Sequence, residues 1–169
     1  MNGSQASSTQ EISTAKLETL YEFANALASA QDITEALDIL LLSLMGITRT
    51  SSSAFFTQQD DGLYRLAVSR GGGDKFCKKE IVDVPEEILS ASYFLHDQAG
   101  FSDSGLDSGT CRLCVPVSRK DTPLGIICLG SKAFDEPYGE EEIRFIQSLA
   151  KLAAMLIENS RFIEKLKDL

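Results

Sequence analysis

The chain has 169 residues and a formal net charge of −9; 43% of its residues are hydrophobic and 24% are charged. This length suits one domain that buries roughly 70% of its unfolded surface, so it needs no disulfide or metal for stability. The acidic balance argues against direct nucleic-acid binding, which requires a basic face. No apolar run approaches the roughly 20 residues that span a bilayer, so we expect no membrane contact.

The N-terminal segment predicts a disordered lead-in followed by two helices. Residues 1–11 are almost entirely polar and cannot bury enough surface to offset the entropy of ordering. Residues Ala36 to Met45 form a second helical stretch that is apolar on more than one side, with Thr34 as its candidate N-cap. Before it, one helical stripe contains Leu17, Leu20, Ala24 and Leu27. No basic segment followed by an apolar stretch opens the chain, which predicts a cytoplasmic protein without a secretory signal.

The middle of the chain predicts short strands. Ser52 to Thr57 and Leu63 to Ser69 flank a polar loop that ends in Gly, which predicts a β-hairpin. Lys79 to Val84 predicts a further strand, and Glu86 to Ser92 predicts a short helix. Tyr93 to His96 fits either an extension of that helix or the start of a strand.

The second half predicts a hairpin and a long helix. Residues 98–109 are mostly Gly, Ser and Asp, which is typical of a long surface loop. Cys111 to Ser118 and Leu124 to Ser131 form the clearest hairpin, joined by Arg119 to Pro123. A helix begins at about Gly139 and continues towards the C-terminus. This order predicts an α+β domain, in which helices pack on an antiparallel sheet.

The last helix carries two apolar stripes. One of them suffices to pack on the domain's own sheet and contains Ile146, Ala150, Ala153 and Ile157. The other has the alternating 4-3 steps of a coiled-coil seam: Phe145, Leu149, Leu152, Leu156, Asn159, Ile163 and Leu166. Because this seam continues where a domain of this size is already complete, we predict a homodimer through Leu149, Leu152, Leu156, Asn159, Ile163 and Leu166. The alternative is one amphipathic helix packed within its own chain.

The cysteines predict reduced core residues. Cys111 and Cys114 have CxxC spacing, but no second CxxC exists, and positions i and i+3 of a strand face opposite sides, so we expect no metal site. If Ser118 pairs with Leu124 in the hairpin, Cys114 lies opposite Cys128, near disulfide reach. We interpret this pair as two buried thiols; a redox switch is the alternative.

No catalytic residues are predicted. The sequence places no nucleophile, base and oxyanion donor together by any motif. His96 beside Asp97 is interpreted as a hydrogen-bonded structural histidine.

Four stretches, in this order, resemble the GAF domain family over the chain from about Ile12 to Leu169. They are the paired N-terminal helices with Asp32-Ile33-Thr34-Glu35-Ala36-Leu37, the strand Ser53-Ala54-Phe55-Phe56, the strand pair Leu113-Cys114-Val115-Pro116-Val117 and Leu124-Gly125-Ile126-Ile127-Cys128-Leu129, and the closing helix with Ile157-Glu158-Asn159-Ser160-Arg161.

The resemblance implies a single GAF domain over residues 12–169 with a six-stranded antiparallel sheet. Its terminal helices would cover one face, and a loop-capped small-molecule pocket would lie on the other. Such domains serve as sensory or dimerisation modules in bacterial signal-transduction proteins, including two-component systems and transcription regulators. We therefore expect an output domain beyond Leu169 and a signalling helix at about 139–168. The pocket residues expected from this arrangement are Phe94, His96, Cys114 and Cys128.

The ligand is not identified by the resemblance. Members that bind cyclic nucleotides have Asn where this chain has Ser131 before Lys132, and bilin-binding members have Cys where Leu95 precedes His96. Members that reduce free methionine sulfoxide have an Asp-x-Asp-Ser turn where this chain has Cys128-Leu129-Gly130-Ser131. We expect a non-catalytic sensory domain with no identified cofactor. A free methionine sulfoxide reductase and a ligand-free dimerisation scaffold are the alternatives.

Overall fold

Six antiparallel strands form one sheet in the order β3-β2-β1-β6-β5-β4, as the family resemblance implied. The structure is a computed structural model, which describes residues 14, 17–18, 20–25, 32–72, 79–97 and 111–169. The strands are β1 (Ser52–Gln58), β2 (Tyr64–Gly71), β3 (Ile81–Val82), β4 (Phe94–Leu95), β5 (Leu113–Arg119) and β6 (Thr122–Leu129). The helices are α2 (Ile33–Thr48), α3 (Glu86–Ser90) and α4 (Glu140–Lys167), with a 3-10 turn η2 (Ala133–Asp135). The predictions for residues 1–11 and 98–109 lie outside the described residues.

The helix α2 begins two residues earlier than its predicted cap allows. The Asp32 carboxylate accepts a hydrogen bond from the Glu35 backbone N–H at 2.8 Å, so Asp32 is the N-cap and Thr34 is not. The helix continues to Thr48, whose buried hydroxyl donates to the Leu44 carbonyl at 2.7 Å. The predicted span from Ala36 to Met45 was therefore too short at both ends.

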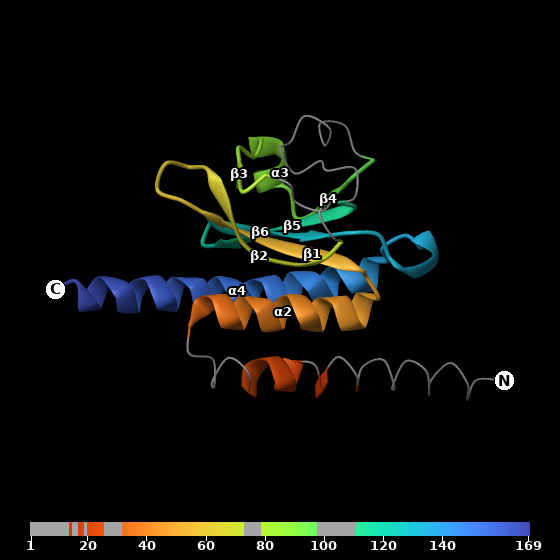
Figure 1. Ribbon diagram of the computed structural model, residues 1–169, viewed down its shortest axis with the longest axis horizontal. Helices are drawn as coiled ribbons and strands as arrows, with labels where there is room; N and C mark the ends of the chain where they lie inside the picture. Colours follow the sequence, from red (N-terminus) through yellow and green to blue (C-terminus); the bar gives the residue numbers. More distant parts are fainter. Residues whose placement is uncertain (1–13, 15–16, 19, 26–31, 73–78, 98–110) are drawn as a thin grey trace.

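The helices α2 and α4 lie side by side along one face of the sheet (Figure 1). Sheet residues such as Phe55 and Ile127 are fully buried between the sheet and these helices. The first predicted stripe of α4 is confirmed, because Ile146, Ala150, Ala153 and Ile157 are all buried in this core. Residues 20–25 are helical, and Phe23 reaches the same core.

The opposite face of the sheet has a smaller core of its own. It contains Phe56, Tyr64 and Ile126 from the sheet, with Ile88 of α3 packed over them. Because β6 is covered on both sides, all of its residues from Leu124 to Leu129 are buried, and the strand reads as a continuous apolar run.

The hairpin of β5 and β6 is tighter than predicted. Lys120 and Asp121 alone make the turn, with φ angles of 49° and 63°, and both strands extend into the segment predicted as the connection. A register shift after Val117 pairs Ser118 with Pro123 instead of Leu124. The predicted pairing of Cys114 with Cys128 is confirmed, because it lies before the shift.

The structure also shows two of the shorter elements for which the prediction from the sequence was ambiguous or too long. Tyr93 to His96 contains the strand β4, which pairs with β5, and does not extend α3. The strand predicted over Lys79 to Val84 is reduced to Ile81–Val82. None of the helices formed by the described residues has the length and apolar character required to cross a membrane.

Candidate functional site

Three of the four predicted pocket residues lie in one row across the sheet. Phe94 of β4 pairs with Cys114 of β5, and Cys114 pairs with Cys128 of β6. All three side chains are buried in the small core, on the face opposite α2 and α4. The next strand continues the row with Ala54, which pairs with Cys128.

A third thiol joins this row, and the sequence analysis missed it. Cys111 lies two residues before β5 begins, so strand alternation does not apply to the interval from Cys111 to Cys114. Its Sγ lies 3.7 Å from the Sγ of Cys114, which in turn lies 3.7 Å from the Sγ of Cys128. The argument that Cys111 and Cys114 face opposite sides was wrong; the CxxC spacing itself was the available signal.

The three buried thiols, which we call the three-cysteine cluster, perturb one another. Hydrogen bonds from Cys114 and Cys128 lower the pKa of Cys111, with a smaller contribution from the nearby Arg112 charge. The same hydrogen bonding raises the pKa of Cys128, which keeps its proton as the donor.

His96 lies apart from the other three predicted residues. Its backbone N–H donates to the Arg112 carbonyl at 3.0 Å, which continues the β4–β5 ladder by one residue. Its side chain is exposed and lines a cavity of about 260 Å³ with Arg112, Lys132 and Tyr138. Of the four residues predicted for one pocket, Phe94, Cys114 and Cys128 are therefore buried in the small core, and His96 lines this separate cavity, which we call the His96 cavity.

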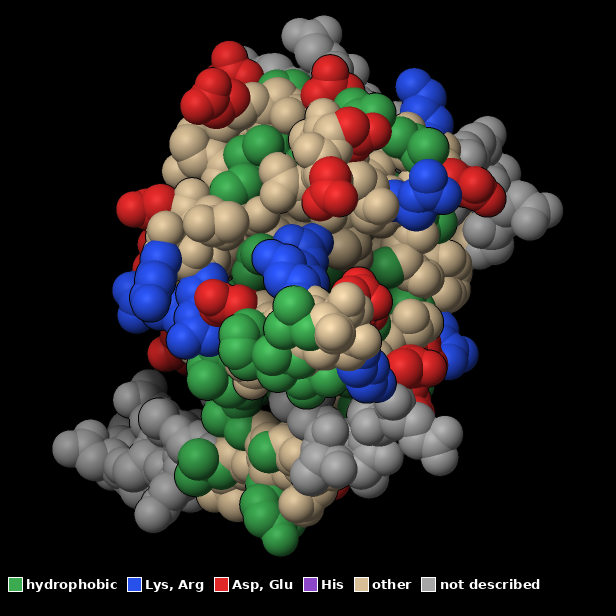
Figure 2. Space-filling view, turned by 90° about the vertical axis from the view of Figure 1, so that its left-hand side faces the viewer, with side chains coloured by type: hydrophobic (Ala, Val, Ile, Leu, Met, Phe, Trp, Pro, Cys, Tyr) green, Lys and Arg blue, Asp and Glu red, His purple; other side chains and the backbone are tan. Residues whose placement is uncertain are grey.

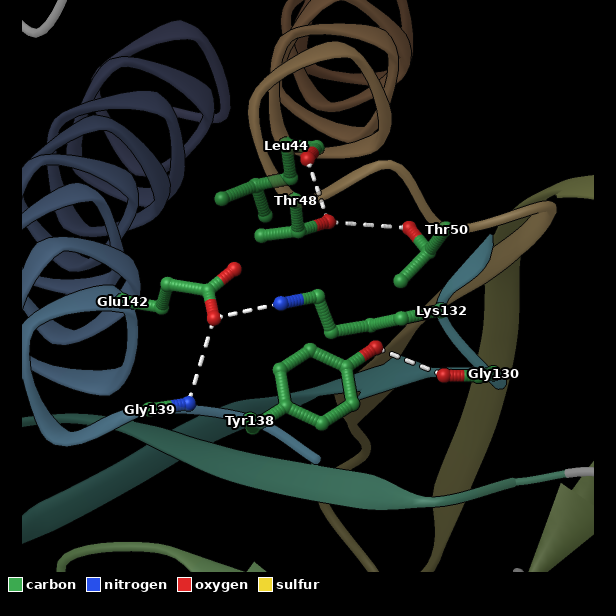
Figure 3. A network of polar contacts seen from close by, with 8 residues as sticks. All are labelled: Leu44, Thr48, Thr50, Gly130, Lys132, Tyr138, Gly139 and Glu142. Carbon is green, nitrogen blue, oxygen red and sulfur yellow. Dashed lines mark hydrogen bonds and ion pairs between the residues drawn. The ribbon is translucent and has the colours of Figure 1, made fainter. Parts of the chain in front are cut away.

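The wall of the His96 cavity is connected to the start of α4 (Figure 3). Lys132 pairs with Glu142 at 2.5 Å, and Glu142 also accepts a hydrogen bond from the Gly139 N–H that caps the helix. The Tyr138 hydroxyl donates to the Gly130 carbonyl at 2.6 Å, and burial raises the pKa of this phenol. A molecule that displaced Lys132 or Tyr138 would therefore disturb the first turn of α4.

A larger hollow of about 900 Å³ lies along the edge of β5, between α3 and α4. It is lined by α3, by β5 residues such as Pro116 and by the α4 residues Gln147, Ala150 and Lys151. Since β4 pairs only with Leu113 and Cys114, no strand formed by the described residues pairs with this part of the β5 edge. None of the predicted pocket residues lines it.

The predicted dimer seam of α4 divides into a buried and an exposed part. Leu149 is fully buried in its own core, so its assignment to the interface was wrong. Leu152 and Leu156 are half-buried, and Asn159 is exposed. Ile163 and Leu166 are each 52% exposed.

The exposed part of α4 runs beyond the rest of the domain. Figure 1 shows the helix continuing past the end of α2. Two polar contacts tie this part of the helix to the sheet: the ion pair of Glu158 with Arg119 at 2.9 Å, and the hydrogen bond from Arg161 to the Gln58 carbonyl at 2.8 Å. Figure 2 views this end of the molecule, where hydrophobic side chains gather among charged ones.

A protein-family model described as "GAF domain" matches residues 32–159, which is more than half of the chain. The match spans α2, the whole sheet and most of α4. Among curated proteins, no sequence matches significantly.

Solved structures share the fold at low sequence identity. The GAF domain of a putative sensor histidine kinase from Pseudomonas syringae pv. tomato superimposes with a TM-score of 0.74 at 16% identity, over 96% of this chain and 98% of that one. The GAF domain of a phosphoenolpyruvate-protein phosphotransferase from Coxiella burnetii gives 0.72 at 19% identity, over 90% and 98%. A GAF domain/HD domain protein from Geobacter sulfurreducens gives 0.65 at 18% identity, over 80% and 98%.

Proposed function

Because this chain belongs to the GAF domain family, whose members are sensory and regulatory domains, we propose that it is a non-catalytic sensory domain that dimerises through the distal part of α4. In this proposal, a small molecule bound in the His96 cavity changes the position of α4. The helix then transmits the change to an output domain that follows Leu169.

The observation that carries the proposal is the exposed apolar surface on the last turns of α4. Ile163 and Leu166 continue the 4-3 spacing of the buried seam, yet about half of each side chain is accessible. Leaving such side chains in water forfeits roughly 25 cal/mol per Å² of apolar surface, whereas a second copy of the helix would cover them. Asn159 at the same seam favours one register, because a polar seam residue pairs with its own copy.

The route from the cavity to the helix supports the sensory part of the proposal. Lys132 and Tyr138 line the His96 cavity and lie in the connection between β6 and α4. A ligand moves the output only by the difference in its affinity for the two positions of α4. An anion that competes with Glu142 for Lys132 provides such a difference, since it binds only when the Lys132–Glu142 pair opens.

The dimer is tested by measuring the solution mass of the whole chain by sedimentation equilibrium. We expect the unaltered chain to form dimers and the double variant Ile163→Ser with Leu166→Ser to be monomeric, because two seam contacts per helix are lost. The matched control is Glu164→Ser, an exposed residue in the same turn that lies outside the seam. A double variant with the mass of the unaltered chain contradicts the proposed interface, as does an unaltered chain that stays monomeric.

The absence of catalysis is tested with free methionine sulfoxide as substrate. We expect no consumption of a dithiol reductant above the rate without substrate, because neither Asp of the reductase turn is present around Cys128. Turnover that disappears in Cys128→Ala would instead assign the chain to the reductases.

A further inference from the structure

The sulfur atoms of the three-cysteine cluster have the spacing of ligands on one metal ion. The Sγ atom of Cys114 lies 3.7 Å from the Sγ atoms of both Cys111 and Cys128, and all three Sγ atoms lie within 4.8 Å of one another. Two sulfurs bound to one ion at about 2.3 Å lie about 3.8 Å apart when the angle at the metal is tetrahedral. A disulfide requires a separation of about 2.05 Å, so no two of these sulfurs are bonded to each other.

The surroundings of the cluster restrict the kind of ion. Cys111, Cys114 and Cys128 are at most 1% exposed. No histidine or carboxylate belongs to the group among the residues that the structure describes. A dry site that offers only sulfur excludes Mg²⁺ and Ca²⁺, which require oxygen ligands, and favours soft ions such as Cu(I) and Zn(II).

A neighbouring positive charge offsets part of the negative charge that such a site acquires. The Arg112 guanidinium donates to the Cys111 backbone carbonyl at 3.4 Å, and its charge contributes to the lowered pKa of the Cys111 thiol. The residue Arg112 also lines the His96 cavity, so its neighbourhood is accessible to solvent. Its positive charge compensates part of the negative charge of three thiolates.

We propose that Cys111, Cys114 and Cys128 bind one soft d¹⁰ metal ion, Cu(I) or Zn(II), through three thiolates. Each thiol gives its proton to solvent as its sulfur binds the ion, and no electron is transferred. Cu(I) is satisfied by the three sulfurs alone, whereas Zn(II) takes a water molecule as its fourth ligand. The proposal does not depend on the α4 dimer, so either can fail while the other holds.

The test uses the whole chain, reduced and loaded under anaerobic conditions with Zn(II), or with Cu(I) supplied from a competing chelator. We expect one equivalent of metal per chain after desalting. X-ray absorption of the loaded chain should show three sulfur ligands at about 2.3 Å, with an additional oxygen only for Zn(II). This spectrum requires no substitution, so it remains decisive if the variants fold poorly.

Two variants and two controls connect the metal to these sulfurs. Cys111→Ala and Cys128→Ala should each lower the affinity for the retained ion at least about 100-fold. Removing only an outer-shell partner of a ligand lowers metal affinity by up to about 100-fold, and removing the ligand itself should lower it at least as much. Ile126→Val removes one methylene from the same small core without removing a sulfur, and it should leave the affinity unchanged. Cys77→Ser, which alters the cysteine outside the described residues, should also retain the ion.

Three outcomes overturn the proposal. The first is a chain that retains no ion of either kind after desalting, which would leave three reduced core thiols. The second is a loaded chain whose spectrum shows fewer than three sulfur ligands. The third is a loss of metal in Cys77→Ser that Cys111→Ala and Cys128→Ala do not reproduce.

Discussion

The two halves of α4 have similar spacing of apolar residues and opposite surroundings. Between Ile143 and Ile157 the helix is buried against the sheet and α2, whereas from Phe162 onwards its apolar side chains are exposed. Apolar periodicity therefore identifies a face that packs, but it does not say whether the partner is the same chain or another molecule. The length of the helix relative to the sheet is the reason why we propose a second copy of the chain as the partner of the distal half.

The anchoring contacts explain where the change occurs. The Lys132–Glu142 pair holds the first turn of α4, and Arg161 makes the last hydrogen bond to the sheet, at the Gln58 carbonyl. Beyond Arg161, Phe162 and Lys165 still line a shallow hollow with Thr122 and Leu124 of β6, but Ile163 and Leu166 remain about half exposed. A device that transmits a signal needs this combination of one end fixed near a cavity and another end available to a partner.

The largest expected difference between the two halves of α4 is the loss of stability when one apolar residue is truncated in each. Leu149→Ala should lower the free energy of unfolding of the monomer by about 2–5 kcal/mol, because it leaves a cavity in a fully packed core. Ile163→Ala should change it by less than about 0.5 kcal/mol, because the side chain is half exposed. Urea unfolding of dilute protein measures both. Equal losses would contradict the division of α4 into two halves.

A half-buried and a buried tyrosine, Tyr138 and Tyr64, test how the start of α4 is fixed. Tyr138→Phe should destabilise the domain by about 1 kcal/mol, because the Gly130 carbonyl loses its 2.6 Å hydrogen bond. Tyr64→Phe should be neutral or stabilising, since the buried Tyr64 hydroxyl has no hydrogen-bond partner among the described residues. The two variants remove the same atom, so they serve as controls for each other in thermal unfolding. The opposite order of stabilities would show that the Tyr138 hydroxyl does not anchor this connection.

The smallest expected effect concerns the ion pair between α2 and β2. Arg70 donates to both carboxylate oxygens of Asp38 and so lowers the pKa of this carboxyl. A lowered folded-state pKa contributes stability above the unfolded-state pKa, near 3.8, and this contribution is lost as the pH falls through the folded-state value. Because the pair is largely exposed, Asp38→Asn should cost at most about 0.5 kcal/mol at pH 7. The cost should vanish in unfolding measurements at the acid end; a cost that persists there would assign it to something other than charge.

Much of the fold was predictable because apolar spacing and turn residues report local structure directly. The hairpin of β5 and β6, the long helix and the pairing of Cys114 with Cys128 all follow from such patterns. The turn at Lys120 and Asp121 was not predictable in the same way, because two non-glycine residues adopt positive φ angles there. The tertiary context overrides their local preference.

The candidate site was predictable only in part. Cys114 and Cys128 meet because a strand register brings them together, which the sequence reveals. Cys111 reaches them from outside the strand, where no periodic rule applies, so its position requires the path of the chain before Leu113. His96 was predicted with them as a residue of the region that caps the pocket in the resembled fold, but its exposed side chain lines another cavity, together with Lys132 and Tyr138.

Backbone amide hydrogen exchange tests whether the last turns of α4 pack against a second copy of the chain. The exchange along α4 is measured at protein concentrations above and below the dimer dissociation constant. We predict that amides from 162 to 167 become more protected as the concentration rises, because a second helix covers them, while amides from 146 to 157 keep the same protection throughout. Protection of the distal amides that does not change with concentration would contradict the claim that the last turns of α4 pack against a second copy of the chain.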